Sequence, residues 1–296
     1  MNMTESILNY RLYLKRKNFS DLTVKNYMHR LKQFFIWVAV PVELTTSTEV
    51  KKYIDYLLEK GMAPHSINCH LSSIRGFYDH LRDEEGVIVE NPVIMGLMLR
   101  EPHPLPRYLH DNDVELFLSS VSRIRDRAMF MLMLRCGLRV QEVANLTLDV
   151  IDYRRSQILI MAGKGAKDRI VYISNDAAVA LAEYLRKRPT AKEQRIFLVE
   201  KGPYKGRPIS VRAIQKRVEF YARKSGIPVS CHRLRHTMAT QLLNADADLV
   251  SIQEILGHTK IKTTQRYSKL SNIKAQRDYF KAMEIVMGKI TINQLE

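Results

Sequence analysis

The stretch Glu101-Pro102-His103-Pro104-Leu105-Pro106-Arg107 separates two parts of the chain that differ in charge and in pattern. Three prolines within five residues favour an extended segment, because proline has no amide hydrogen for a helix and its ring fixes the backbone. Residues 1–107 carry 14 basic and 12 acidic side chains, whereas residues 108–296 carry 33 and 19. We therefore expect a first domain over residues 1–100, a linker over residues 101–107 and a second domain over residues 108–296.

The first domain is predicted to be a small all-helical bundle. Thr46 and Glu49 have the spacing of a capping box, an apolar stripe follows them, and Gly61 ends that helix. The same periodicity predicts three more helices, over residues 5–16, 22–38 and 64–81.

The second domain is predicted to be mixed. Helices are expected over residues 113–121 and 125–134, and β-rich runs occupy residues 156–161 and 169–173. A basic, glycine-containing turn lies between the two runs, which predicts a β-hairpin, and the chain from Asp176 onward is predicted to be mostly helical. The expected fold class is mainly α with a small antiparallel β-sheet, in which the second domain is α+β.

The amino-acid composition limits the classes of function that the chain can have. With 46% hydrophobic and 26% charged residues, the 296-residue chain is an ordinary globular protein and not a disordered one. The net charge of +16, nearly all of it in the second domain, indicates a polyanionic partner, most often nucleic acid. Three widely spaced cysteines without a CxxC pair indicate a reducing compartment and no zinc site. No apolar run is long enough to cross a bilayer, so a cytoplasmic location is expected.

Two segments of the second domain carry residues suited to chemistry. In His232-Arg233-Leu234-Arg235-His236, residues three apart share a helix face, so either His232 with Arg235 or Arg233 with His236 can face a common target. Spacing alone leaves both pairings open. Further along, nine residues separate His258 from Tyr267, and a continuous helix would turn by about 900° and place them on opposite sides.

The sequence supplies a break between those two residues. Gly257 is a good C-terminal stop for one helix, and Thr263 is a good N-cap for the next. Arginines, histidines, a lysine and a tyrosine together suit phosphoryl transfer without a metal. Neither an acidic cluster with Mg²⁺ spacing nor a Walker glycine loop is evident.

Five motifs, in this order along the chain, resemble those of tyrosine recombinases of the phage integrase family, with the size and layout of Xer-type recombinases. They are LSSIRGFYDHL (71–81), GLRVQE (137–142), GKGAKDR (163–169), HRLRHTMAT (232–240) and QEILGHTKIKTTQRY (253–267). The resemblance implies a helical core-DNA-binding domain of SAM-like fold followed by a catalytic domain with a C-terminal tail. Aspartate stands at position 246, where many relatives have glycine, and it tolerates the left-handed backbone of that turn.

The resemblance also implies a catalytic set of two arginines, one lysine, two histidines and a tyrosine: Arg139, Arg235, Lys164, His232, His258 and Tyr267. Tyr267 would be the nucleophile, and Glu142 would support the site from behind the residues that touch DNA. The implied reaction cuts and rejoins DNA strands through a covalent 3′-phosphotyrosyl intermediate. It requires no metal, no ATP and no other cofactor.

The implied partner is double-stranded DNA, bound by a homo-tetramer, or a hetero-tetramer with a related recombinase, on two DNA sites. An apolar face near the C-terminus either packs on its own domain or, as we favour, docks on a neighbouring subunit; its residues are Tyr279, Phe280, Met283, Ile285 and Val286. Two alternatives stay open at this point. One is a DNA-relaxing enzyme resembling type IB topoisomerases, and the other is a DNA-binding regulator without catalysis.

Overall fold

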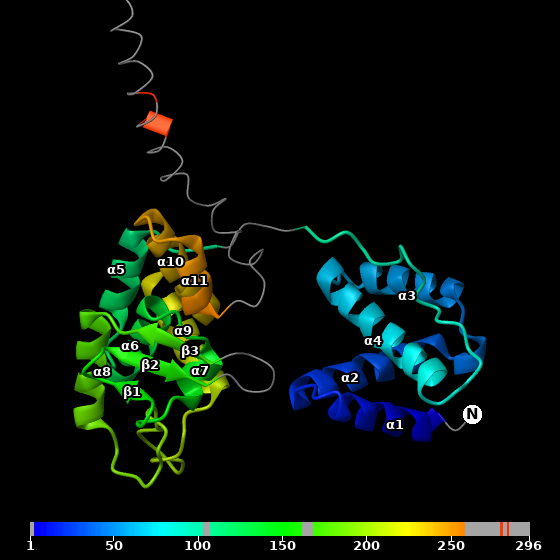
Figure 1. Cartoon of the computed structure of the whole chain (residues 1–296), viewed down its shortest axis with the longest axis horizontal. Helices are drawn as coiled ribbons and strands as arrows, with labels where there is room; N and C mark the ends of the chain where they lie inside the picture. The colour runs from blue at the N-terminus through cyan, green and yellow to red at the C-terminus, as the bar shows by residue number, and fades with distance from the viewer. Residues whose placement is uncertain (1–2, 103–106, 162–167, 258–278, 281–282, 284–296) are drawn as a thin grey trace, which may run out of the picture. The chain divides into compact units, whose positions relative to one another are not determined.

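The computed structural model describes residues 3–102, 107–161, 168–257, 279–280 and 283. The chain divides into two compact units, Met1–His103 and Pro104–Glu296 (Figure 1). Two of the linker prolines, Pro104 and Pro106, lie outside the described residues. Within the described ranges, the search for a helix both long and apolar enough to cross a membrane finds none.

The first unit is helical, as predicted. Its elements are α1 (Met3–Arg16), α2 (Asp21–Val38), the short 3-10 helix η1 (Val42–Leu44), α3 (Ser47–Glu59) and α4 (Pro64–Asp83).

Local chemistry explains where these helices begin. The predicted capping box is formed: the Thr48 amide donates to Thr46 Oγ1 at 3.2 Å, and the Thr46 amide donates to Glu49 Oε2 at 3.0 Å. Pro64 opens α4, where its missing amide hydrogen costs nothing. Gly61 follows α3 with a φ of +70°, a conformation that glycine adopts without a steric penalty.

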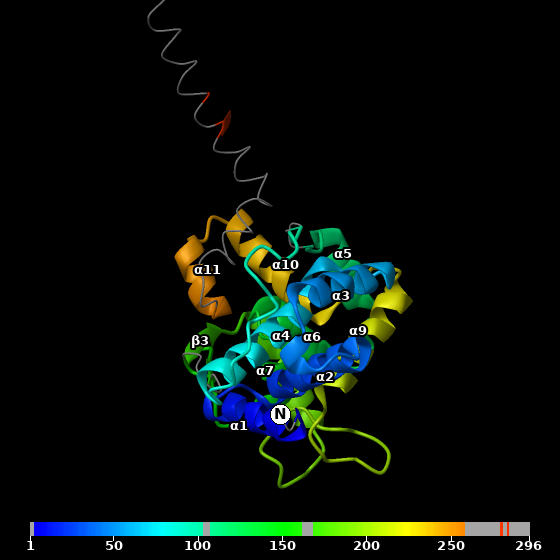
Figure 2. The ribbon, with the colours of Figure 1, turned by 90° about the vertical axis from the view of Figure 1, so that its right-hand side faces the viewer.

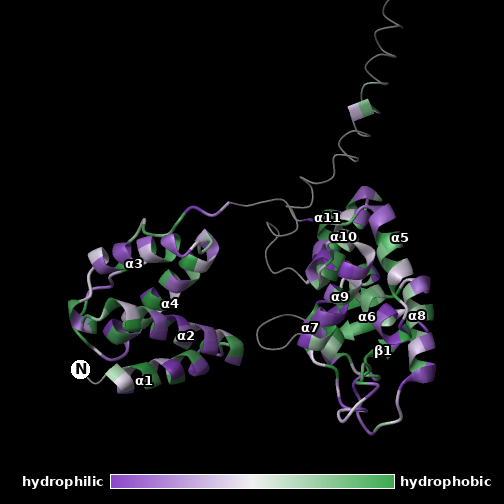
Figure 3. Cartoon of the chain, turned by 180° about the vertical axis from the view of Figure 1, so that it is seen from behind, coloured by the Kyte–Doolittle hydropathy of each residue, from purple (hydrophilic) through white to green (hydrophobic). Residues whose placement is uncertain are grey.

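Helix α4 is the centre of the first unit. Its apolar stripe is fully buried, and it packs against α2 and α1. The Tyr78 hydroxyl donates to the Val42 carbonyl at 3.0 Å, which joins α4 to η1. Hydrophobic and hydrophilic residues alternate along the helices of both units, as expected for helices with one buried face (Figure 3).

The second unit surrounds a small antiparallel sheet with helices. Its helices are α5 (Asp111–Ser120), α6 (Ile124–Arg135), α7 (Val140–Asn145), α8 (Asn175–Lys187), α9 (Val211–Ser225), α10 (Cys231–Asn244) and α11 (Leu249–Leu256). The strands are β1 (Ile151–Asp152), β2 (Gln157–Ile160) and β3 (Arg169–Tyr172), in the order β1-β2-β3.

The two strands of the predicted hairpin are confirmed, with Ile158 opposite Val171 in the register. The turn that joins them, residues 162–167, lies outside the described residues. Strand β1 adds two residues to the edge of the sheet that the sequence did not predict.

The core of the second unit is α6. Every residue from Ala128 to Leu134 is buried, because α6 packs against α8 on one side and α10 and α9 on others. This all-round burial explains the apolar run in the sequence. Helices α10 and α11 lie side by side at one end of the unit (Figures 1 and 2).

As far as residue 257, the chain from Asp176 onward is mostly helical, as predicted, through α8, α9, α10 and α11. The exception is the segment of residues 188–210, which forms turns and two isolated β-bridges. The physical reason is composition: three prolines and two glycines in this segment interrupt any helix. The expected left-handed turn at Asp246 is confirmed, with a φ of +63°.

Candidate active site

Arg235 lies inside the second unit on α10. The helix begins after Ser230, whose Oγ accepts from the Arg233 amide at 3.2 Å. Arg235 is only 2% exposed, and its two terminal nitrogens donate to main-chain carbonyls of two other segments, Gly137 and Leu256. A guanidinium keeps its charge even when buried, so these contacts fix a permanent positive charge and its orientation.

Arg139 is the N-cap residue of α7 and is more exposed, with 44% of its side chain accessible. Its Nη1 pairs with Glu142 Oε1 at 2.9 Å, and its Nη2 donates to the Gly257 carbonyl at 3.1 Å. The Arg139 amide also donates to Glu142 Oε2 at 2.7 Å. Glu142 therefore holds both the backbone and the side chain of Arg139.

Arg169 is a residue of this site to which the sequence interpretation gave no role. It opens β3, is 8% exposed, and grips Glu142 with both terminal nitrogens, at 2.7 and 2.8 Å. Its Nε donates to the Ile255 carbonyl at 2.8 Å. The signal in the sequence was an arginine at the first residue of a half-buried strand, since such a residue needs a buried carboxylate partner.

The pKa of Glu142 reflects this setting. Burial pushes the pKa upward, but the hydrogen bonds and charges of Arg169 and Arg139 outweigh burial and hold it below its usual range. Glu142 is therefore an anion that ties two arginines together.

All three arginines of the site donate hydrogen bonds to the C-terminal end of α11. Each binds a different, consecutive main-chain carbonyl: Arg169 binds Ile255, Arg235 binds Leu256 and Arg139 binds Gly257. Carbonyls at a helix C-terminus lack intrahelical partners and carry partial negative charge, so cations are stabilised there. The predicted helix end at Gly257 is confirmed by its φ of +60°. A Cβ at Gly257 would also lie 2.8 Å from Arg169 Cδ. Both the backbone conformation and this close approach therefore favour glycine at this position.

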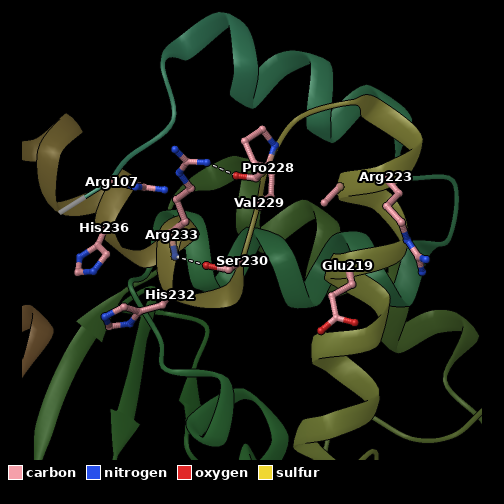
Figure 4. Close-up of a pocket in the computed structure, with 10 residues that line it drawn as sticks. Arg107, Glu219, Arg223, Pro228, Val229, Ser230, His232, Arg233 and His236 are labelled. Carbon is pink, nitrogen blue, oxygen red and sulfur yellow. Dashed lines mark hydrogen bonds between the residues drawn. The ribbon is translucent and has the colours of Figure 1, made fainter. Parts of the chain in front are cut away.

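His232 lies one turn before Arg235 on α10, on the exposed side of the helix. Its ring meets that of His236 with centroids 4.1 Å apart, and both line a pocket that also contains Arg107 and Arg233 (Figure 4). The structure thus brings Arg139, Glu142 and Arg235 to the end of α11 and places His232 at the rim of a neighbouring pocket.

Lys164, His258 and Tyr267 lie outside the described residues, as do Thr263 and the apolar residues Ile285 and Val286. Along the chain, Lys164 precedes Arg169 by five residues and His258 directly follows Gly257. Among the residues with a described position, no group of three or more His, Cys, Asp or Glu side chains is arranged to hold a metal ion.

Removing the Glu142 carboxylate should destabilise the second unit strongly. In Glu142→Ala, the buried guanidinium of Arg169 loses its partner, and breaking a buried pair costs about 3–5 kcal/mol. Because the pKa of Glu142 is lower in the folded chain, its contribution is present above the unfolded pKa and is lost as the pH falls through the folded pKa. The measurement is denaturant unfolding of wild type and variant between neutral and acid pH.

A matched control is Glu219→Gln, which breaks the exposed pair with Arg212 at 3.6 Å. An exposed pair of this kind contributes about 0–1 kcal/mol. If Glu142→Ala loses no more stability than this control, the carboxylate does not hold the arginines together.

Comparison with known proteins agrees with this architecture. Residues 107–273 match the phage integrase family, and residues 7–86 match the N-terminal SAM-like domain of phage integrases. The tyrosine recombinase XerD of Pseudomonas putida is 34% identical over 88% of this chain and 91% of its own length. XerA of Thermococcus kodakarensis is 30% identical over 96% of this chain and 98% of its own. The XerH recombinase bound to its palindromic difH substrate superposes with a TM-score of 0.73 at 20% identity, over 89% of this chain and 80% of that chain.

The chain belongs to the phage integrase family, because the family model covers more than half of its residues. Within that family it is an Xer-like tyrosine recombinase, an enzyme of site-specific DNA recombination.

Proposed function

We propose that Arg139 and Arg235 bind the non-bridging oxygens of the DNA phosphate that is cut. The observation that carries this proposal is the fixation of both guanidinium groups at one helix end, from two different elements of the fold. A phosphodiester is anionic and gains charge on its equatorial oxygens as it reacts. Planar, permanently charged arginine forks match those oxygens in geometry and charge.

Tyr267 is the proposed nucleophile. Its Oη attacks phosphorus while His232 takes the phenol proton, the bond from phosphorus to the 5′ oxygen breaks, and Lys164 protonates the leaving 5′ oxygen. The product is a 3′-phosphotyrosyl linkage, which retains the energy of the broken DNA bond. A 5′ hydroxyl from another strand then attacks the linkage and restores both the DNA bond and the free tyrosine.

The other members of the set assist. His258 donates a further hydrogen bond to the phosphate, and Glu142 keeps Arg139 in place through the contacts described above. No metal, ATP or other cofactor takes part in the proposed reaction.

The proposed partner is double-stranded DNA, and the site of action is the cytoplasm. The excess of 33 basic over 19 acidic residues in 108–296 supports a polyanionic partner, and the XerH structure of the same fold is a complex with DNA. We also propose a tetramer on two DNA sites, homomeric or with a related recombinase. Tyr279 and Phe280, which stay 59% and 55% exposed in the single chain, support docking of the C-terminal segment on a neighbouring subunit.

Two other functions agree less well with these observations. A DNA-relaxing enzyme resembling type IB topoisomerases would use similar residues, but the similarity to Xer recombinases over about nine-tenths of the chain favours recombination. A regulator without catalysis would have no need for Arg235 and Arg139 to be held in a fixed geometry.

Covalent capture tests the proposal. We expect the purified protein, mixed with fragmented genomic DNA and stopped with detergent, to retain DNA through a bond that survives denaturation. Sequencing of the retained fragments should reveal one short, partly palindromic site. Fragments without a common sequence, or no retained DNA in the presence of all candidate partner recombinases, would contradict a site-specific covalent mechanism.

A further inference from the structure

The pocket at whose rim His232 lies is basic and is next to the proposed active site. It encloses about 710 Å³ between the C-terminal half of α9 and the start of α10 (Figure 4). Its charged and titratable lining residues are Arg107, Glu219, Arg223, His232, Arg233 and His236. His232 and His236 form the wall on the side of the active-site helix, so pocket and active site share α10.

The charge in this pocket is strongly positive. Three arginines face one carboxylate, and Glu219 is paired with Arg212 on the same helix at 3.6 Å, which offsets part of its charge. The first turn of α10 adds the positive end of a helix dipole, since Ser230 caps the helix and lines the pocket. The pocket therefore favours an anion.

Arg233 supplies a second and independent observation. Its Nη1 donates to the Pro228 carbonyl, whereas its Nε is buried and has no hydrogen-bond partner among the residues that the structure describes (Figure 4). Native proteins rarely leave a buried donor unpaired. An oxygen of an anion in the pocket would satisfy this donor once the guanidinium turns toward it.

We propose that this pocket binds a second, uncut phosphate of the DNA strand that is cleaved. The proposal rests on the proposed function and extends it. The described residues that line the pocket include no phenylalanine, tyrosine or tryptophan, and its three arginines match the oxygens of a phosphate in charge and geometry, so the phosphate is the proposed recognised group. Holding a neighbouring phosphate through α10 fixes the register of the strand against Arg235 without reading its sequence.

The test removes the charge of single DNA phosphates and, separately and together, the charge of the Arg233 side chain. Methylphosphonate, which removes the charge, replaces one phosphate at a time around the cleavage site, and affinity is measured for wild type and Arg233→Gln. We expect one position at which methylphosphonate weakens DNA binding by wild type several-fold but causes no further loss of affinity in Arg233→Gln. The slope of log affinity against log salt should fall by about 0.9 in the variant, the loss of one phosphate contact.

Two further variants sharpen the result. Arg107→Gln changes an exposed lining residue and should show the same non-additive position without disturbing α10. Arg155→Gln, in the β1–β2 turn and not among the residues that line the pocket, is the matched control and should leave the effect of methylphosphonate at every position the same as in wild type. Melting curves of all variants show that each is folded.

The possible results distinguish failure of the pocket proposal from failure of the proposed function. Suppose that wild type binds and cuts DNA while the affinity lost through Arg233→Gln or Arg107→Gln simply adds to the affinity lost through methylphosphonate at every position. In that case the pocket does not hold a DNA phosphate. If inorganic phosphate alone protects the wild-type pocket from arginine modification as well as DNA does, the site is for a free anion and the proposal is wrong. If wild type neither binds nor cuts DNA, the proposed function itself has failed.

Discussion

Tyr267→Phe should abolish covalent attachment of the chain to DNA while leaving DNA binding in place. The substitution removes one oxygen atom, the one that would form the phosphotyrosyl bond. An unperturbed tyrosine has a pKa near 10 and is mostly protonated at neutral pH, so the reaction also depends on a nearby base and on positive charge. Phenylalanine has no atom that could take over the role, and we expect complete loss.

A nicked substrate, in which the short cleaved strand diffuses away, traps the adduct and makes the measurement direct. The covalent complex runs as a slower band on a denaturing gel. Tyr153→Phe, at a half-exposed tyrosine before β2, is the matched control and should form the adduct normally. An adduct from Tyr267→Phe at the wild-type yield would show that another residue is the nucleophile.

Arg235→Lys should slow strand cleavage by about 10²–10³, the typical effect of losing one preorganised donor to a developing oxyanion. Lysine keeps the positive charge but not the planar fork. In the structure the two ends of the Arg235 fork are already committed to the carbonyls of Gly137 and Leu256. An ammonium group cannot hold both carbonyls in that geometry and also present donors to a phosphate.

Single-turnover cleavage, with enzyme in excess, isolates this effect from product release. Melting curves measure the separate loss of stability that comes from the two buried carbonyls. Arg212→Lys, on the exposed face of α9, is the matched control and should cleave at the wild-type rate. If Arg235→Lys is folded and cleaves within about tenfold of wild type, the assigned role of Arg235 is wrong.

Much of the fold could be predicted from periodicity and capping. The helices of the first unit begin within two residues of where the sequence placed them, because apolar periodicity and local signals such as Thr46 and Pro64 need no tertiary contact. The segment 188–210 could not be predicted in detail, because its shape depends on pairing with distant residues. Examples are the bridges of Thr147 with Arg195 and of Leu198 with Pro208.

Some contacts of the candidate site could be predicted from the sequence and others could not. The pairing of Arg139 with Glu142 follows from their spacing of three residues at the start of a helix. The contacts of Arg169 and Arg235 could not be predicted, because their partners at the end of α11 are main-chain carbonyls. Every residue has a carbonyl, so no residue type in the sequence marks the ones that an arginine will bind. The roles assigned to Lys164, His258 and Tyr267 stay predictions.

The stability of one short helix affects three arginines of the candidate active site. Helix α11 is only eight residues long, and its last turn holds Arg139, Arg169 and Arg235 at once. Local unfolding of this turn would break one main-chain contact of each arginine at the same moment, while Glu142 would still hold Arg139 and Arg169 and the Gly137 carbonyl would still hold Arg235. The three arginines therefore share a single opening equilibrium for these contacts. The fraction of molecules in which all three guanidinium groups are held at both ends is set by the stability of one helical turn.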